Sequence, residues 1–138
     1  PGGWIELKAT SEEKKSVQAF IRESDAVLIA IDAPALMEPY QEDEWRGRWH
    51  QQINQPVVIR TLFEGAYKGL KSSKLVILAP VKCEKYIKKG KSGELLSRIQ
   101  KEYAGLLSFF RADDLFANVA VSVLRSKVVL VLLLFYLV

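Results

Sequence analysis

The sequence predicts an α/β protein: a mostly parallel, doubly wound sheet with flanking helices. Continuous apolar runs bounded by polar residues are typical of strands that are buried on both faces of a parallel sheet. These runs alternate with stretches of helical periodicity, which are long enough to connect parallel strands. The chain has 138 residues, of which 49% are hydrophobic, so we expect a single domain over residues 1–138.

The first helix is predicted from about Ser11 to Glu23. Thr10 and Glu13 have the spacing of a capping box, in which the threonine side chain and the glutamate side chain satisfy each other's backbone N–H groups. Apolar residues then recur on one face of the helix, among lysines and other polar residues. We therefore expect an amphipathic helix that begins at a defined residue.

Three apolar runs predict the strands of the sheet. The first covers residues 25–32 and is bounded by aspartates, the second covers residues 74–80, and the third covers residues 118–124. Parallel sheets of this class bind ligands at the carboxyl ends of their strands. The residues that follow each run are therefore the candidates for a functional site.

Two helical stretches lie between these strands. Before the second strand, Pro56 interrupts the periodicity, which predicts either one kinked helix or two helices that meet there. The apolar positions on either side are Trp45, Trp49, Ile53, Ile59, Phe63, Tyr67 and Leu70. Before the third strand, Ser92 is predicted as an N-cap. The apolar face of that helix is predicted to comprise Leu95, Ile99, Tyr103, Leu106 and Phe110.

The run Val128–Val138 contains only apolar residues. It is shorter than the roughly 20 residues that a membrane-spanning helix needs, so no transmembrane span is predicted. Its β-branched start suits a strand, whereas its leucine-rich end suits a helix or a truncated membrane segment equally well. Such a run cannot stay exposed, so we favour a buried strand in the sheet or a homo-oligomer contact.

Cysteine, histidine and lysine usage limits the function classes. A lone cysteine and a lone histidine cannot build a disulfide or a Cys/His metal site, which favours a reducing, cytoplasmic location and no bound metal. Five lysines fall within ten residues from position 82 to position 91. No aromatic residues interleave with them regularly, so the stretch carries no specific nucleic-acid signal and favours a solvated loop and helix entry.

The four residues Val81-Lys82-Cys83-Glu84 follow the second predicted strand. They resemble the guanine-recognition motif of Ras-like P-loop GTPases, usually Asn/Thr-Lys-x-Asp. The resemblance implies that Glu84 accepts hydrogen bonds from two guanine N–H groups and that the stem of Lys82 lies against the base. Val81 replaces the polar first position and Glu84 is one methylene longer than aspartate, so the implied preference for guanine is weakened.

Pro1-Gly2 resembles the end of the Asp-x-x-Gly segment of the same family, whose glycine N–H senses the γ-phosphate. The resemblance then covers residues 1–124 as the carboxyl-terminal part of a Ras-like (TRAFAC-type) GTPase domain of the bacterial conflict or signalling kind. It implies that the intact domain binds GTP together with magnesium, and that Gly2, Lys82 and Glu84 are among its nucleotide-binding residues. The phosphate loop Gly-x-x-x-x-Gly-Lys-Ser/Thr does not occur in this sequence, so we expect neither cofactor binding nor hydrolysis by this chain alone.

Two other interpretations stay open. Asp32, Thr61 and Lys82 are similar to the phosphoacceptor aspartate, threonine and lysine of receiver domains. That interpretation requires a central strand over residues 57–61, whereas the GTPase interpretation requires a helix there, which the periodicity favours. The remaining interpretation is a non-enzymatic interaction module that self-associates through Val128–Val138.

Overall fold

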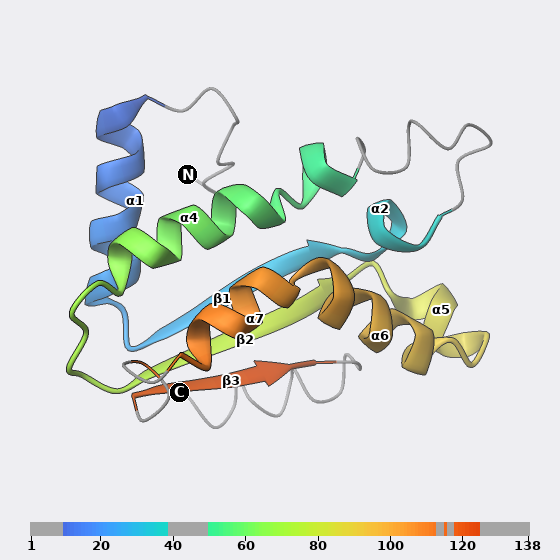
Figure 1. The fold of residues 1–138 in the computed structure, drawn as a ribbon. Helices are drawn as coiled ribbons and strands as arrows, with labels where there is room; N and C mark the ends of the chain where they lie inside the picture. Colours follow the sequence, from blue (N-terminus) through green and yellow to red (C-terminus); the bar gives the residue numbers. More distant parts are fainter. Residues whose placement is uncertain (1–9, 39–49, 113–114, 116–117, 125–138) are drawn as a thin grey trace.

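The computed structural model describes residues 10–38, 50–112, 115 and 118–124. In this part of the chain, three strands form one open, fully parallel sheet in the order β1-β2-β3. The strands are β1 (Ala26–Asp32), β2 (Lys74–Val81) and β3 (Val119–Val123), as Figure 1 shows. The predicted α/β class and the predicted parallel pairing are therefore confirmed.

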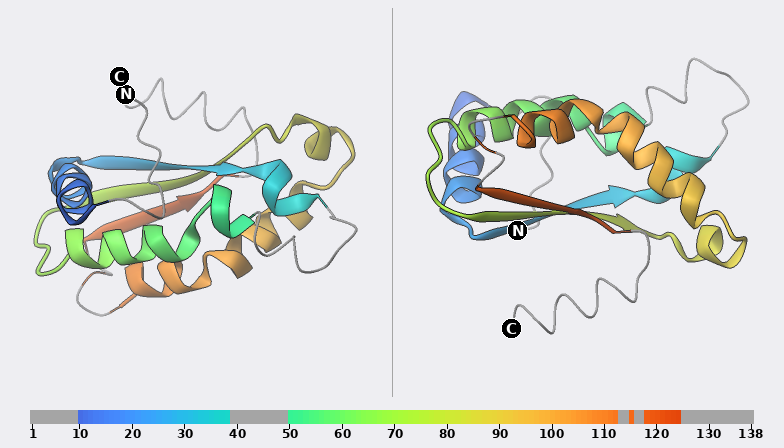
Figure 2. Two further views of the ribbon diagram at one scale, coloured as in Figure 1. Left: turned by 90° about the horizontal axis from the view of Figure 1, so that it is seen from above. Right: turned by 60° about the horizontal axis from the view of Figure 1, so that its bottom comes forward.

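The described helices are α1 (Ser11–Glu23), α2 (Ala33–Met37), α4 (Pro56–Ala66), α5 (Glu84–Lys88), α6 (Ser92–Glu102) and α7 (Ala104–Phe110). Of these, α1, α4, α6 and α7 lie on one side of the sheet (Figure 2). A doubly wound sheet has helices on both faces, so the described residues do not confirm that part of the predicted fold. Helix α4 lies between α1 and α7, and α2 packs against α6. The short helices α2 and α5 directly follow β1 and β2, so they mark the edge of the sheet at which these strands end.

Helix α1 begins where the sequence predicts it. The Thr10 N–H donates to the Glu13 carboxylate at 2.6 Å, and the Glu13 N–H donates to the Thr10 hydroxyl at 3.2 Å. Both halves of the capping box are therefore formed. These bonds to Thr10 also hold the pKa of Glu13 below its usual value.

The chain before α4 forms two helical segments rather than one continuous helix. Residues 50–53 are helical, Gln55 then takes a left-handed backbone conformation with φ of 47°, and α4 begins at Pro56. Proline is favoured in the first turn because no intrahelical partner exists there for an N–H. Residues 57–61 are thus helical, and the strand that the receiver interpretation requires is not formed. Trp45 and Trp49 lie outside the described residues.

Two details of the next connection differ from the sequence prediction. Helix α6 begins at Ser92 itself, after Lys91, so Ser92 is the first helical residue and not the N-cap. The predicted apolar face is buried along its whole length, but the helix breaks at Tyr103 and continues as α7. Leu95, Ile99, Tyr103, Leu106 and Phe110 are each at most 1% exposed. The periodicity therefore predicted the buried face correctly and missed the break.

The main core lies between the sheet and the helices. Ile29 and Ile31 of β1 and Val76 and Leu78 of β2 contribute to it from below the helices. A second, smaller cluster on the other face of the sheet contains Ile77, Ala79 and Leu124. Because neighbouring residues of a strand point to opposite faces, β2 is buried on both sides, as its apolar run predicts.

Cations also connect elements that are distant in the sequence. Arg22, at the end of α1, donates to the carbonyls of Ala66 and Lys68 at 2.7 and 2.8 Å. Lys74, at the start of β2, is 6% exposed and donates to the Arg22 carbonyl at 2.7 Å. These bonds fix the ends of α1, α4 and β2 together, opposite the edge at which β1 and β2 end.

Two sequence predictions concern other parts of the chain. Gly2 and Val128–Val138 lie outside the described residues, so the γ-phosphate role and the self-association contact stay predictions. None of the helices that the structure describes combines the length and the apolar character that a membrane span requires.

Candidate functional site at the ends of strands β1 and β2

The candidate site is built around an ion pair between the first residue after β2 and the last residue of β1. The Lys82 ammonium lies 2.7 Å from the Asp32 carboxylate. The Lys82 side chain is 69% exposed, whereas that of Asp32 is 16% exposed. Lys82 also has a positive φ of 55°, a conformation that L residues rarely adopt. The chain thus turns sharply at the end of β2 and directs Lys82 toward the end of β1.

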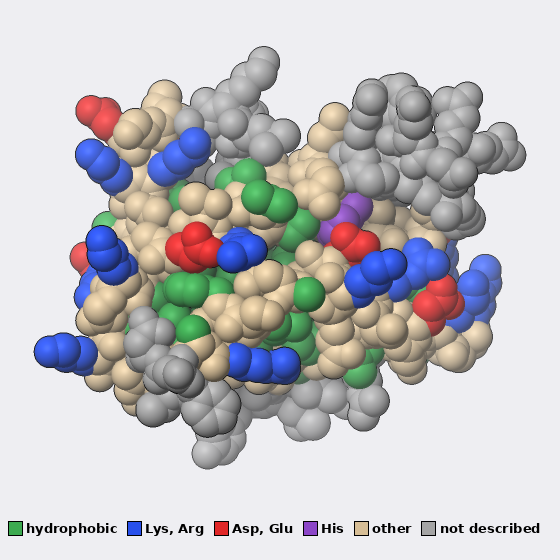
Figure 3. Space-filling model, in the orientation of Figure 1, with side chains coloured by type: hydrophobic (Ala, Val, Ile, Leu, Met, Phe, Trp, Pro, Cys, Tyr) green, Lys and Arg blue, Asp and Glu red, His purple; other side chains and the backbone are tan. Residues whose placement is uncertain are grey.

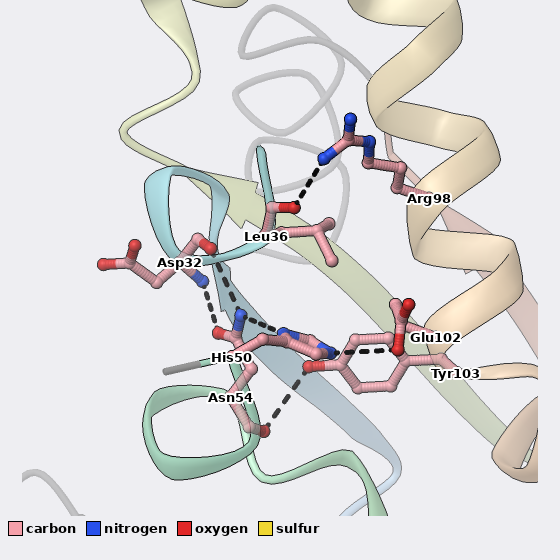
Figure 4. Close-up of polar contacts among 7 residues, drawn as sticks. All are labelled: Asp32, Leu36, His50, Asn54, Arg98, Glu102 and Tyr103. Carbon is pink, nitrogen blue, oxygen red and sulfur yellow. Dashed lines mark hydrogen bonds and ion pairs between the residues drawn. The ribbon is translucent and has the colours of Figure 1, made fainter. Parts of the chain in front are cut away.

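Asp32 also begins helix α2. Its other carboxylate oxygen accepts a hydrogen bond from the Ala35 N–H at 2.9 Å, which is the N-cap interaction, and Pro34 occupies the first turn. Helix α2 is held at its far end by Arg98 of α6, which donates to the Leu36 carbonyl at 3.0 Å (Figure 4). The Asp32 carboxylate is thus shared between a helix cap and Lys82, so its position is well defined.

The Asn54 side chain binds the backbone of Asp32 at both polar groups. The Asp32 N–H donates to Asn54 Oδ1 at 2.7 Å, and Asn54 Nδ2 donates to the Asp32 carbonyl at 3.2 Å. The Leu75 N–H of β2 donates to the Asp25 carbonyl, so the backbone groups of Asp25 are directed toward β2. Backbone groups alternate in direction along a strand, so those of every second residue after Asp25 also face β2 and those of the residues between, including Asp32, face away from it. Asp32 therefore faces the outer edge of β1, where the Asn54 amide takes the place of a neighbouring strand.

His50 lies behind Asn54 and is 5% exposed. Its Nδ1 is 2.9 Å from Asn54 Nδ2, and its Nε2 is 3.7 Å from a Glu102 carboxylate oxygen (Figure 4). The Tyr103 hydroxyl donates to the Asn54 carbonyl at 3.4 Å, and the Tyr103 ring meets the His50 ring edge to face. Burial lowers the pKa of His50, and the negative charge of Glu102 opposes this to a smaller extent. Burial also raises the pKa of Tyr103.

Helix α5 covers the other side of the strand end. Cys83 is buried, its thiol lies 3.6 Å from the Pro80 carbonyl oxygen, and Glu84 is the exposed first residue of the helix. Lys85 forms an ion pair with Glu38, which also accepts a hydrogen bond from the Tyr86 hydroxyl. The hydrogen bond from Lys85 is the main reason that the pKa of Glu38 is lowered. Basic side chains at this end of the molecule alternate with acidic ones (Figure 3).

The structure brings together some of the residues that the sequence singles out. Asp32 and Lys82 are in direct contact, and Glu84 is two residues beyond Lys82 at the same edge. Thr61 is elsewhere: it is exposed on α4, and its hydroxyl donates to the Val57 carbonyl at 3.1 Å. Gly2 lies outside the described residues. The Asp32–Lys82 pair of the receiver interpretation is therefore formed without its Thr61. Lys82 is the residue that the GTPase and the receiver interpretations share.

Neither Asn54 nor His50 was predicted as part of the site. Their i, i+4 spacing was a usable signal, because it places two polar side chains on one helical face next to Pro56. What the sequence could not indicate is the strand end that this face contacts.

No protein-family model, curated protein or solved structure matches this chain.

Proposed function

We propose that the chain is the base-binding portion of a GTPase-like nucleotide-binding domain. The observation that carries the proposal is the position of Lys82 and Glu84, immediately after the central strand β2 and at the edge where Asp32 ends β1. Open parallel sheets bind ligands at this edge. The proposal is supported further by the order β1-β2-β3, which sets the three strand ends side by side.

The two residues have different tasks in this proposal. Glu84 is exposed at the start of α5, and its carboxylate is the kind of group that accepts hydrogen bonds from the N1–H and exocyclic amino groups of guanine. The ammonium of Lys82 is paired with Asp32, so the methylene groups of the lysine side chain lie along the surface between the two residues. A purine ring can lie against such a stem. Guanine is then distinguished from adenine by the hydrogen bonds to Glu84, because adenine presents an acceptor at N1.

Phosphate binding needs groups beyond those at this edge. Backbone N–H groups of a glycine-rich loop and its lysine supply most of the affinity for nucleotide phosphates, and this sequence contains no such loop. Among the residues that the structure describes, no three His, Cys, Asp or Glu side chains converge in a way that fits magnesium. We therefore propose weak, base-directed binding by this chain, and GTP hydrolysis only in an intact domain that supplies the loop.

The proposal is tested by NMR of the isotope-labelled chain with GDP and, separately, ADP at millimolar concentration. We expect GDP to shift the amide signals of residues 82–84 and ADP to shift them less. Glu84→Ala should remove the difference between the two nucleotides, and Lys82→Ala should weaken both. Two controls change exposed residues elsewhere: Glu94→Ala on α6 removes the same charge as Glu84→Ala, and Lys88→Ala on α5 removes the same charge as Lys82→Ala. Both controls should leave the GDP response intact. An equal response to ADP, or none at residues 82–84, would refute the proposal.

A phosphoacceptor site is the second candidate, because the contact between Asp32 and Lys82 is also the one that an aspartyl phosphate site uses. An acyl phosphate donor would transfer its phosphoryl group to an Asp32 carboxylate oxygen and release the carboxylate of the donor. Incubation with acetyl phosphate followed by intact-mass measurement tests this. A stable or hydroxylamine-sensitive phosphoryl adduct that Asp32→Asn abolishes would favour the second candidate over the first.

A further inference from the structure

We propose that Asn54 is a positioning residue for Asp32 and Lys82, and that protonation of His50 removes its hold on them. The inference rests on the proposed function, because it concerns the strand end at which the base is proposed to bind. The hydrogen bonds on which it depends are independent of any ligand. The candidate switch and the candidate base site can therefore be tested separately.

The direction of the hydrogen bonds fixes the orientation of the Asn54 amide. The Asp32 N–H can only donate, so the Asn54 atom 2.7 Å from it is the carbonyl oxygen. The Asp32 carbonyl can only accept, so the Asn54 atom 3.2 Å from it is the NH₂ group. The same NH₂ group is 2.9 Å from His50 Nδ1. His50 Nδ1 must therefore be an acceptor, and the single ring proton of neutral His50 belongs on Nε2, which faces Glu102.

Protonation of His50 turns this arrangement into a conflict. An imidazolium carries a proton on both nitrogens, so Nδ1–H and Asn54 Nδ2–H would point at each other. Rotating the Asn54 amide by half a turn does not help, because its NH₂ group would then face the Asp32 N–H. Either the histidine or the asparagine must move. Because His50 is buried and packs against Tyr103, we expect the asparagine to move, and the backbone of Asp32 then loses the two bonds that hold the outer edge of β1.

The surroundings of His50 determine the pH at which its ring becomes protonated. Among the described residues, the titratable groups that face it come from the end of α6: the Glu102 carboxylate, which favours the imidazolium, and the Tyr103 hydroxyl, which is directed to the Asn54 carbonyl. At the end of β1, the Asp32 carboxylate is directed to Lys82 and the Ala35 N–H. Glu102 is more than a third exposed, so water screens its effect. Burial dominates and lowers the pKa of His50, so the neutral form holds the site at neutral pH.

The consequence reaches Lys82 through Asp32. The Asp32 backbone and carboxylate belong to one residue, so a shift of the strand end also moves the carboxylate that caps α2 and binds Lys82. We therefore expect acidification to weaken binding of a purine base at residues 82–84. Guanosine is the appropriate probe because it carries no phosphate group that titrates in the same range.

The chain contains a single histidine, so its titration can be followed without ambiguity. NMR of the labelled full chain between about pH 5 and pH 8 covers the range in which histidine titrates. We expect neutral His50 to carry its proton on Nε2, and the backbone amide signal of Asp32 to shift with the same midpoint as the His50 ring. A proton on Nδ1 in the neutral form, or an Asp32 amide that does not respond, would overturn the proposal.

Two variants separate positioning from general structural support. In Asn54→Asp, a carboxylate replaces the NH₂ donor opposite Nδ1, so the midpoint of the His50 titration should rise by about one pH unit or more. In His50→Gln, an amide oxygen can accept the same hydrogen bond without titrating, so the pH response of the Asp32 amide should disappear. An unchanged midpoint in Asn54→Asp, or a persisting response in His50→Gln, would contradict the mechanism. If Asn54→Asp does not fold, the wild-type titration alone still decides.

Guanosine binding distinguishes failure of the switch from failure of the proposed function. In the wild type, the guanosine-induced shifts at residues 82–84 should decrease on acidification, and in His50→Gln they should not. Equal pH dependence in both proteins would overturn the switch and leave the base site in place. If guanosine causes no shift at any pH but the Asp32 amide follows His50, the positioning role stands and the proposed function fails.

Discussion

Lys82 and Asp32 form an ion pair at 2.7 Å, although fifty residues separate them in the sequence. The parallel pairing of β1 with β2 places Asp32 beside Val81, so the next residue along the chain is within reach of its carboxylate. Because the same carboxylate caps α2, this contact links the ends of two strands and the start of a helix.

Two replacements of Asp32 should distinguish the contribution of its ion pair to stability from the contribution of its helix cap. Asp32→Asn keeps an acceptor for the Ala35 N–H and loses only a pair with a 69% exposed lysine, so the free energy of unfolding should fall by less than about 1 kcal/mol. Asp32→Ala also removes the cap, which should cost about 1 kcal/mol more. Urea unfolding of both variants measures the difference. Equal stabilities would mean that the cap contributes nothing.

Stability should depend on the protonation of His50. Its pKa is lowered in the folded protein, so the unfolded chain binds the proton more tightly. The stabilisation is therefore present above the unfolded pKa, about 6.5, and is lost as pH falls through the lower, folded pKa. His50→Gln should make the difference in unfolding free energy relative to the wild type vary with pH in this window. Chemical denaturation at a series of pH values tests this, and a pH-independent difference would contradict it.

Two buried tyrosines should respond in opposite ways to removal of their hydroxyl groups. The Tyr67 hydroxyl has no hydrogen-bond partner among the described residues, and burial raises its pKa to about 12. Tyr67→Phe should therefore leave stability unchanged or raise it by up to about 1 kcal/mol. Tyr103→Phe loses the bond to the Asn54 carbonyl and should cost about 0.5–1.5 kcal/mol. Thermal or urea unfolding distinguishes the two, and a larger loss for Tyr67→Phe would be inconsistent with these contacts.

The apolar run Val128–Val138 provides a prediction that rests on the sequence, because it lies outside the described residues. Eleven consecutive apolar side chains are not expected to remain in water. Removing residues 128–138 should lower the melting temperature or change the oligomeric state in sedimentation experiments. A monomer before and after truncation, with an unchanged melting temperature, would show that the run is neither buried nor an interface.

Most of the regular structure was predictable because burial imposes it locally. The strands were found to within two residues at each end, since continuous apolar runs between polar residues have few alternatives in an α/β chain. Helix α1 was found because its capping box lies within four consecutive residues. The short helices α2 and α5 were missed, although Asp32 followed by Pro34 is an N-terminal helix signal that could have indicated α2.

The site was less predictable, because its contacts join distant parts of the chain. The rule that ligands bind at strand ends singles out the residues after each strand, and among these the structure places Asp32 and Lys82 in contact. The role of Asn54 depends on the helix–strand packing that brings it to the edge of β1. Hydrophobic periodicity predicts which face of a helix is buried, but it does not predict which backbone groups of other elements that face will contact.

The proposed preference for guanine at Glu84 is tested most directly by replacing the hydrogen-bond acceptor at this position with a donor. A carboxylate accepts from the N1–H and amino groups of guanine, whereas the amide of Glu84→Gln can donate to the additional carbonyl of xanthine. The measurement is the ratio of the dissociation constants for GDP and xanthosine diphosphate, obtained by NMR titration of both proteins. We predict that the wild type prefers GDP and that Glu84→Gln reverses or abolishes this preference. The same ratio in both proteins would contradict base recognition at this site.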